Sequence, residues 1–316
     1  AGLRSVGRAV TDAAAVLRTA GSPSPRLDAE LLAALAIRRD RAWVVAYPDA
    51  PLDAVAAAEL EAAVSRRATG EPIAYIRGYK EWLSLRLAVD ERVLIPRPET
   101  ELLAELAIAE LRRRLAAPTP DERVVAWDVG TGSGAIAVAI GVALRDAVST
   151  GRLRLVASDI SEDALAVAAS NLERHGLTGA VELAAADLLA ADSGVAPQCS
   201  VDVVIANLPY VPSADVPRLP IAASFEPRTA LDGGSDGLDA LRRLLAVLRE
   251  RLDVDGCALL EVGDAQADAV RTAAVGIGLR VDAMHRDLAG TERVVCISHG
   301  VHGVPDVQPG EGLVAW

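Results

Sequence analysis

The alternation of apolar and polar positions divides the chain into a helical first part and a longer second part of mixed strands and helices. Over residues 27–37, apolar side chains recur at the spacing of one helix face. A second helical run over 52–67 has Asp53 as a favourable N-cap and Gly70 as a stop. The first part is therefore predicted to be a small helical bundle, and none of its residues is a candidate for catalysis.

The next segment changes from the period of a helix to that of a strand. Apolar and polar residues alternate over 83–89, which predicts a half-buried strand. The segment 73–76, followed by Gly78, is its expected hairpin partner. Beyond the hairpin, the pattern predicts a proline-marked boundary at 95–100, a helix to about residue 114 and a loop at 118–120.

The remaining sequence alternates short apolar runs with helical patterns. Strands are predicted at 124–129, 153–158, 181–185, 201–206, 257–262, 279–285 and 293–298. Helices are predicted at 134–145, 162–175, 238–252 and 264–275. Repeated strand–helix units indicate an α/β fold with a mostly parallel sheet covered on both faces. Residues 300–316 are rich in Gly and Pro and are expected to be a tail.

Composition narrows the class of protein. The chain has 316 residues, of which 51% are hydrophobic, so it is too apolar to be disordered and long enough for two domains. A formal net charge of −12 and a single lysine, Lys80, disfavour direct binding to nucleic acid. The longest uncharged stretch, 129–144, is too short and too rich in glycine to cross a membrane.

Cysteine usage indicates the compartment. Cys199, Cys257 and Cys296 are odd in number, far apart and without a CxxC spacing. This disfavours a disulfide framework and a structural metal site. The first 20 residues carry charges without an apolar core, so no signal peptide is expected. We expect a soluble, cytoplasmic protein that does not bind membranes and holds no metal.

The sharpest local motif is Asp128-Val-Gly-Thr-Gly-Ser-Gly134, between the first predicted strand of the sheet and its helix. Such glycines let the backbone approach a ligand closely, and the helix start presents free N–H groups. The candidate cofactor-binding residues here are Gly130, Thr131, Gly132, Ser133 and Gly134. The spacing Gly130-x-Gly132-x-x-Ala135 also fits a dinucleotide fingerprint, so the loop leaves a nicotinamide cofactor and S-adenosylmethionine open.

Two acidic residues follow the next two strands. Asp159 ends the second predicted strand, where a carboxylate can accept both ribose hydroxyls of either cofactor. It could instead cap the following helix. Asp187 ends the third strand, where it could accept a hydrogen bond from an adenine amino group or simply be a loop acid.

The fourth strand runs directly into Asn207-Leu208-Pro209-Tyr210, which we call the tetrad. An asparagine at a strand end is often only a turn residue. This set nevertheless suits methylation of a planar nitrogen, whose delocalised lone pair is weakly nucleophilic. The Asn207 oxygen and the Leu208 carbonyl, held by the following proline, can accept its two N–H groups, and Tyr210 can stack on its plane.

Taken together, these segments resemble the HemK/PrmC-type protein-glutamine N5-methyltransferases, within the class I S-adenosylmethionine-dependent methyltransferases. The resemblance covers about residues 25–298. It is carried by Arg26-Leu-Asp-Ala-Glu-Leu-Leu32, Gly70-Glu-Pro-Ile-Ala-Tyr75, Leu94-Ile-Pro-Arg-Pro-Glu-Thr-Glu101, Gly130-Thr-Gly-Ser-Gly134, Asp159, Asn207-Leu-Pro-Tyr210, Phe225-Glu-Pro227, Ala230-Leu-Asp-Gly-Gly234, Gly237-Leu238 and Arg286-Asp-Leu-Ala-Gly-Thr-Glu-Arg293.

The resemblance implies a helical substrate-recognition domain at 1–71, a β-hairpin linker at 72–95, a Rossmann-like seven-stranded methyltransferase domain at 96–299, and a tail at 300–316. It implies that the glycines and Asp159 hold the methionine and ribose ends of S-adenosylmethionine, with Leu188 beside the adenine. The tetrad would bind the glutamine of the Gly-Gly-Gln motif in a peptide-chain release factor.

One position departs from the family pattern. The family tetrad is usually Asn-Pro-Pro-Tyr, whereas this chain has Leu208, as ribosomal-RNA adenine dimethyltransferases do. An adenine-N6 methyltransferase acting on RNA or DNA is therefore the alternative, with local basic runs at 112–114 and 242–243. A nicotinamide-dependent oxidoreductase and a non-catalytic binding module are the further alternatives.

Overall fold

The computed structural model describes residues 4–116, 123–189 and 200–299. Cys199, the expected loop at 118–120 and the expected tail lie outside these residues. The chain divides into two compact units, Ala1–Tyr79 with Leu219–Phe225, and Lys80–Arg218 with Glu226–Trp316. Each unit is described by itself.

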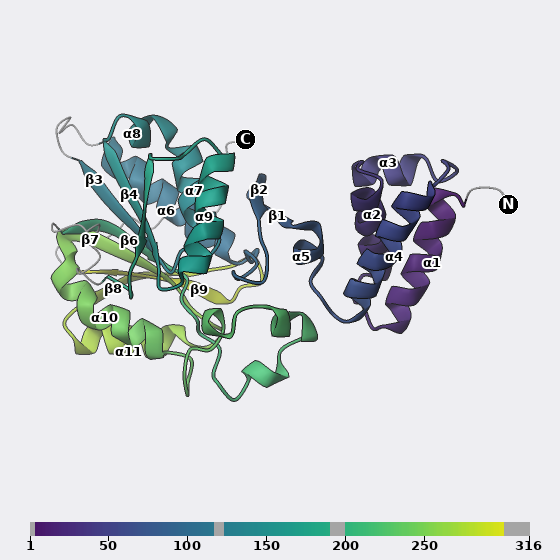
Figure 1. Ribbon diagram of the computed structural model, residues 1–316. Helices are drawn as coiled ribbons and strands as arrows, with labels where there is room; N and C mark the ends of the chain where they lie inside the picture. The colour runs from purple at the N-terminus through teal and green to yellow at the C-terminus, as the bar shows by residue number, and fades with distance from the viewer. Residues whose placement is uncertain (1–3, 117–122, 190–199, 300–316) are drawn as a thin grey trace. The chain divides into compact units, whose positions relative to one another are not determined.

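The first unit is a helical bundle, as predicted (Figure 1). Its helices are α1 (Val6–Thr19), α2 (Pro25–Ala36), α3 (Arg41–Ala46), α4 (Ala54–Ala68) and α5 (Ile73–Arg77). Asp53 caps α4 by accepting a hydrogen bond from the Ala56 backbone N–H at 2.8 Å, which fills one of the free donors at a helix start. Alanine, valine and leucine side chains from α1, α2 and α4 form the core.

Two acids on α2 are buried in this bundle, Asp28 and Glu30. Asp28 accepts hydrogen bonds from Arg67 at 2.8 Å and from the hydroxyls of Ser22 and Ser24. Glu30 is paired with two arginines, Arg26 at 2.6 Å and Arg41 at 2.9 Å. The acids of the Arg26–Leu32 motif therefore tie helices together, because a buried carboxylate must be paired.

The hairpin differs from its prediction. Residues 73–76, the expected first strand, form α5, and the first strand is β1 (Tyr79–Trp82). The second strand is β2 (Leu85–Ala88), so Leu83 lies in the turn and not in the strand. Leu83 and Ser84 have φ of 45° and 59°, as a two-residue turn requires at both positions. The usual Asn-Gly signal is absent, which explains why the sequence pattern misplaced the turn.

The second unit contains a seven-stranded sheet in the order β5-β4-β3-β6-β7-β9-β8. Its strands are β3 (Val124–Val129), β4 (Leu153–Asp159), β5 (Val181–Ala185), β6 (Val201–Ala206), β7 (Leu252–Glu261), β8 (Arg280–Arg286) and β9 (Glu292–Ser298). The strands from β5 to β7 pair in parallel, and β9 is antiparallel to both β7 and β8. The predicted α/β, Rossmann-like fold is confirmed.

Helices cover both faces of this sheet (Figure 1). On one face, α6 (Thr100–Leu115), α7 (Ala135–Ala143) and α9 (Glu162–Arg174) enclose one apolar core, with α8 (Arg145–Ser149) following α7. On the other face, α10 (Asp239–Arg251) and α11 (Ala267–Gly276) enclose a second core. The helix predicted over 134–145 is interrupted at Leu144, where α7 ends and α8 begins. Within the described residues, none of the helices has the length and apolar character needed to cross a membrane.

Candidate functional site

Polar residues and glycines gather at the carboxyl ends of the parallel strands. Gly130 follows β3, Asp159 ends β4, Asn207 follows β6, and Glu261 ends β7. Asp187 lies two residues beyond Ala185, where β5 ends as predicted. Because these strands are parallel, their carboxyl ends meet at one edge, where open α/β sheets bind ligands.

The glycine loop, residues 130–134, has a backbone that only glycine adopts without strain. Gly130, Gly132 and Gly134 have φ of 72°, 55° and 78°. The Thr131 N–H donates to the Ser158 carbonyl at 2.8 Å, and the Gly134 N–H donates to the Thr131 carbonyl at 2.8 Å. A Cβ on Gly132 would meet no atom within 4 Å, so this part of the loop faces open space.

Asp128 lies under the glycine loop and is completely buried. Its Oδ2 accepts a hydrogen bond from the Thr131 hydroxyl at 2.6 Å. Its Oδ1 has no hydrogen-bond partner among the described residues. Burial raises the pKa of Asp128 to about 7, against the lowering effect of the Thr131 hydroxyl. The glycine loop therefore packs over a buried carboxyl group. Ionisation of this group is unfavourable, and its Oδ2 accepts a hydrogen bond from the Thr131 side chain.

Asp159 joins the glycine loop to the start of α9. Its two carboxylate oxygens accept backbone hydrogen bonds, one from the Gly132 N–H and one from the Ser161 N–H, both at 2.9 Å. The cap of α9 is Ser161, which accepts from the Ala164 N–H. Asp159 is therefore not the helix cap that the sequence left open. Each carboxylate oxygen still has lone-pair capacity for a further donor.

Asn171, on α9, binds the backbone of the glycine loop. This residue was not identified from the sequence. Its side-chain amide donates to the Ser133 carbonyl at 2.8 Å and to the Ala88 carbonyl at 2.9 Å. Its Oδ1 accepts from the Ala88 N–H at 2.6 Å. This buried amide therefore fastens the hairpin strand β2 to the glycine loop. The signal in the sequence is a lone asparagine beside Leu172 on the apolar face of a helix.

The tetrad begins beside the glycine loop. The Asn207 side-chain amide donates to the Thr100 hydroxyl at 3.0 Å. In this orientation the amide nitrogen of Asn207 faces Thr100, and its Oδ1 faces away from Thr100. Leu208 is buried, and its Cδ2 lies so close to Gly130 that a Cβ there would be only 2.9 Å away. The leucine that replaces the usual proline therefore packs directly on the glycine loop.

The end of the tetrad is held by backbone contacts. The Tyr210 carbonyl accepts a hydrogen bond from the Gln266 side chain at 2.9 Å. A Cβ on Gly233 would lie 2.5 Å from the Pro209 carbonyl, and one on Gly237 would lie 2.2 Å from the Tyr210 carbonyl. The glycines of segment 230–237 are therefore required because the tetrad backbone passes against them. Burial raises the pKa of the Tyr210 phenol above its usual range.

An ion pair joins two of the motifs that carry the family resemblance. Arg97, from the proline-marked segment, is paired with Glu226, from the Phe-Glu-Pro segment. Glu226 also accepts a hydrogen bond from the Ile95 N–H at 3.3 Å. The Arg97 carbonyl accepts from the Trp82 indole at 2.8 Å. The segment that precedes α6 is thus held by Glu226 and by Trp82. It places Thr100, the first residue of α6, within hydrogen-bond distance of the tetrad.

The two residues expected near an adenine have different surroundings. Asp187 is exposed and ion-paired with Arg243 on α10 at 2.5 Å. Leu188 has a φ of 56°, in the left-handed region that a leucine adopts at a cost of about 1–2 kcal/mol. Such strain is often found at ligand sites. The Leu188 side chain packs against the core that α10 and α11 cover.

Glu261 is the other residue that the sequence reasoning missed. It is completely buried, and neither carboxyl oxygen reaches hydrogen-bond geometry with a partner among the described residues. Burial raises its pKa to about 7, while the nearby Thr100 hydroxyl and Arg293 act to lower that pKa. The signal was an acid at the end of an apolar strand, the same pattern that had singled out Asp128 and Asp159.

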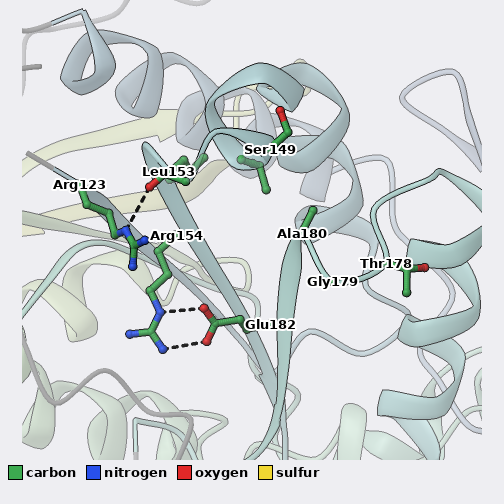
Figure 2. Close-up of a pocket in the computed structure, with 10 residues that line it drawn as sticks. Arg123, Ser149, Leu153, Arg154, Thr178, Gly179, Ala180 and Glu182 are labelled. Carbon is green, nitrogen blue, oxygen red and sulfur yellow. Dashed lines mark hydrogen bonds and ion pairs between the residues drawn. The ribbon is translucent and has the colours of Figure 1, made fainter. Parts of the chain in front are cut away.

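A cleft of about 410 Å³ lies at the opposite edge of the sheet, where β4 and β5 begin (Figure 2). Arg123, Arg154 and Glu182 line it, and Arg154 makes two hydrogen bonds with Glu182 at 2.8 Å and 2.7 Å. None of the sequence-predicted site residues lines this cleft. Because it lies at the amino ends of the strands, it is not where an open α/β sheet binds its cofactor.

Comparison with known families gives two matches along the chain. A family model described as the PrmC N-terminal domain matches residues 8–78. A second, described as ribosomal protein L11 methyltransferase, matches residues 106–209. The solved catalytic domain of hMettl16, in complex with a MAT2A 3'UTR hairpin, is 14% identical and covers 71% of this chain and 78% of that chain, with a TM-score of 0.51. That likeness shows the methyltransferase fold alone.

Curated relatives extend along nearly the whole chain. The release factor glutamine methyltransferase of Moorella thermoacetica is 38% identical, over 90% of this chain and 95% of its own length. That of Coxiella burnetii is 38% identical over 89% of this chain and 95% of its own length. That of Koribacter versatilis is 39% identical over 80% of this chain and 85% of its own length. Similarity of this degree and extent shows that the chain belongs to the release factor glutamine methyltransferase family.

Proposed function

We propose that this chain transfers a methyl group from S-adenosylmethionine to the side-chain amide nitrogen of a glutamine in a peptide-chain release factor, in its Gly-Gly-Gln motif. The observation that carries the proposal is the placement of Asn207 beside the glycine loop, with its amide nitrogen engaged by Thr100. Its relatives bear the name of this activity.

The residues at the carboxyl edge fit S-adenosylmethionine. The space in front of Gly132 leaves room for a ligand against the loop backbone. The Asp159 carboxylate supplies acceptors for ribose hydroxyls, since both of its oxygens keep lone-pair capacity. S-adenosylmethionine supplies a methyl group activated by a positively charged sulfur.

The tetrad would prepare the substrate amide for attack. An amide nitrogen is planar and a weak nucleophile, because its lone pair is delocalised into the carbonyl group. The Asn207 Oδ1 and the Leu208 carbonyl would accept its two N–H groups and hold the nitrogen in line with the methyl carbon. Tyr210 would stack on the amide plane. The proton can be lost after transfer, so no strong base is required.

The direct test is incubation of the full chain with S-adenosylmethionine and a purified release factor. Mass spectrometry of the digested factor should show one added methyl group on the Gly-Gly-Gln glutamine. A factor with that glutamine changed to glutamate is the control and should remain unmodified. Transfer of label to ribosomal RNA or DNA, with none to the factor, would instead support the adenine-N6 alternative.

Substitutions separate the two parts of the proposed site. Asn207→Ala should lower kcat about 100-fold or more, the usual scale for losing one polar group at the reacting centre. Its affinity for S-adenosylmethionine should stay within about threefold of wild type, since Asn207 is proposed to hold the substrate amide; equal losses in kcat and kcat/KM would mark an interaction made only in the transition state. Asp159→Ala should mainly weaken cofactor binding, measured by titration calorimetry. Equal losses of cofactor affinity in both variants would contradict these roles.

A cytoplasmic location is part of the same proposal. The two cysteines within the described residues, Cys257 and Cys296, are both buried and free. Free thiols are typical of proteins in a reducing compartment. Mass spectrometry of the protein taken from cells, with free thiols blocked at lysis, tests this: a disulfide would contradict it.

A further inference from the structure

Glu261 is a buried acid for which the proposed chemistry gives no role. Ala206 on β6 pairs with Leu260 on β7, so the next residues along the two strands, Asn207 and Glu261, lie side by side at this edge of the sheet. Both Glu261 oxygens are buried without a hydrogen-bond partner among the described residues. An unsatisfied buried polar group costs about 1–3 kcal/mol, so its presence in a folded protein calls for a reason.

Thr100 connects the two residues. It is buried at the first position of α6, and its Oγ1 accepts the hydrogen bond from the Asn207 amide at 3.0 Å. A threonine hydroxyl has one hydrogen to donate, and here that hydrogen is not used by Asn207. Because Asn207 and Glu261 are neighbours at the ends of β6 and β7, the Thr100 hydroxyl that binds Asn207 lies beside this carboxyl, and it lowers the pKa of Glu261. Glu261 is thus an acceptor next to the Thr100 hydroxyl.

The other charged and titratable groups around Glu261 come from β9, from the segment before α6 and from the tetrad. Arg293 on β9 and Arg97, ahead of α6, both favour the ionised carboxylate. Glu99 opposes it. The Tyr210 phenol lies on the tetrad side, and Glu261 contributes to raising its pKa. Arg293 is itself engaged with Asp287 at 3.1 Å and with the Val262 carbonyl at 3.1 Å, so it acts on Glu261 from a fixed position.

The consequence concerns which way the Asn207 amide faces. Its oxygen and nitrogen ends have nearly the same shape, and only hydrogen bonding tells them apart. An ionised Glu261 accepts only, so it takes the Thr100 hydrogen and leaves Oγ1 with lone pairs for the Asn207 nitrogen. A protonated Glu261 can donate to Thr100, which frees the Thr100 hydrogen to bond the Asn207 oxygen.

We propose that Glu261 is a positioning residue that, through the Thr100 hydroxyl, keeps the Asn207 oxygen turned toward the substrate amide. This role rests on the proposed function of Asn207. Glu261 needs no contact with substrate or cofactor for it. The buried carboxyl is then explained as the terminal acceptor of a chain that runs from Asn207 through Thr100.

The experiment compares kcat, KM and cofactor affinity for four variants of the full chain. Thr100→Val and Glu261→Met remove the hydroxyl and the acceptor at nearly constant volume, and each should lower kcat about tenfold or more, below the loss expected for Asn207→Ala. The double variant should be no worse than either single variant, because both break one chain. Thr100→Ser keeps the hydroxyl and should restore most of the activity. S-adenosylmethionine affinity should stay within about twofold of wild type.

The dependence of kcat on pH tests the role of the Glu261 charge, because a change in packing alone would not alter this dependence. Because the active form is the ionised one, wild-type kcat should rise with pH through about 7 and fall below it. Glu261→Gln cannot ionise and should lose this limb. Leu259→Val, two residues earlier on β7 and buried in the core, is the matched control for loss of packing and should keep the limb.

The outcomes distinguish this proposal from the one on which it rests. Wild-type kcat in Thr100→Val and Glu261→Met, with Asn207→Ala inactive, would overturn the positioning role and leave the proposed function standing. Full glutamine methylation by Asn207→Ala would overturn the tetrad's function itself. Losses of kcat matched by equal losses of cofactor affinity and stability would also overturn the positioning role.

Discussion

Asp128 is a single side chain that should make the stability of the second unit depend on pH. Its folded-state pKa of about 7 lies well above the ordinary value of 3.8, because it is buried. Between these two pH values the folded protein holds a proton that the unfolded chain has released. The stabilisation is therefore complete below about pH 4 and is lost as pH rises toward 7.

Asp128→Asn should reduce this loss. Asparagine can still accept the hydrogen bond from Thr131, but it carries no charge to bury. Relative to wild type, the variant should gain roughly 1–3 kcal/mol between pH 5 and pH 8, since one pKa unit corresponds to about 1.4 kcal/mol. Urea unfolding at the two pH values, without cofactor, measures this difference.

The control is Glu250→Gln, which removes an exposed acid on α10. Its stability difference from wild type should be the same at both pH values. If Asp128→Asn behaved in the same way as this control, Asp128 would have to be charged in the folded protein at pH 5, and the argument from burial would be wrong.

At the residue scale, the sequence pattern singles out those candidate site residues that follow a strand. Asp159 and Asn207 are candidates because an acid or amide at the end of an apolar run marks the edge of the sheet. Glu261 has the same position and was missed, since the groups that surround it come from segments far away in the chain. Asn171 could not be predicted, because the carbonyls it binds, on Ser133 and Ala88, belong to two other elements.

At the scale of elements, the glycine loop and the tetrad are packed into one structure through Gly130 and Leu208. Gly130 has a positive φ, and a Cβ at this position would lie 2.9 Å from Leu208 Cδ2. A substitution at Gly130 would therefore encounter two penalties, backbone strain and a steric clash. Gly132 has only the first, because a Cβ there meets nothing within 4 Å.

This difference predicts a selective rescue. Gly130→Ala should weaken S-adenosylmethionine binding about tenfold or more, equivalent to about 1.4 kcal/mol or more. Adding Leu208→Ala relieves the clash and should recover part of that affinity, while the strain from φ remains. Gly132→Ala should show no rescue by Leu208→Ala. Titration calorimetry of the four variants and wild type measures this, and equal rescue at both glycines would contradict the contact.

The elements themselves were largely predictable, and the failures have a local cause. The strands β3, β5 and β6 begin and end at the predicted residues, because each is a short apolar run with clear ends. The hairpin was misplaced because its turn at Leu83 and Ser84 lacks glycine and asparagine. Residues 73–76 have a composition that suits either a strand or a short helix, and the α5 backbone ends at Gly78 in the left-handed conformation.

At the scale of the molecule, the chain folds into two units whose boundary is not a simple cut in the sequence. The segment Leu219–Phe225 belongs with the helical unit, although the strands before and after it in the chain, β6 and β7, belong to the second unit. A Cβ on Gly70 would lie 2.6 Å from the Ile221 side chain, which shows how closely this segment packs there. No local pattern in the sequence predicts such a contact, because it joins residues about 150 positions apart.

The helical unit has a cleft of its own on its surface. A cleft of about 420 Å³ is lined by residues that include Trp43 and Val55, and the Arg39 guanidinium lies over the Trp43 ring at 5.7 Å. Val55 lines this cleft and is 69% exposed. We propose that this unit recognises the release factor, and Val55 is the place to test it.

Val55→Asp should raise KM for an intact release factor about fivefold or more and leave kcat unchanged, because a charge in an apolar contact costs affinity without touching the chemistry. Helix stability should be preserved, since an acid is favourable in the first turn of α4. KM for a short peptide that contains only the Gly-Gly-Gln motif should not change. Leu288→Asp, at a fully exposed leucine of the other unit, is the matched control and should affect neither substrate. Equal increases in KM for factor and peptide would show that the helical unit does not act in recognition through this surface.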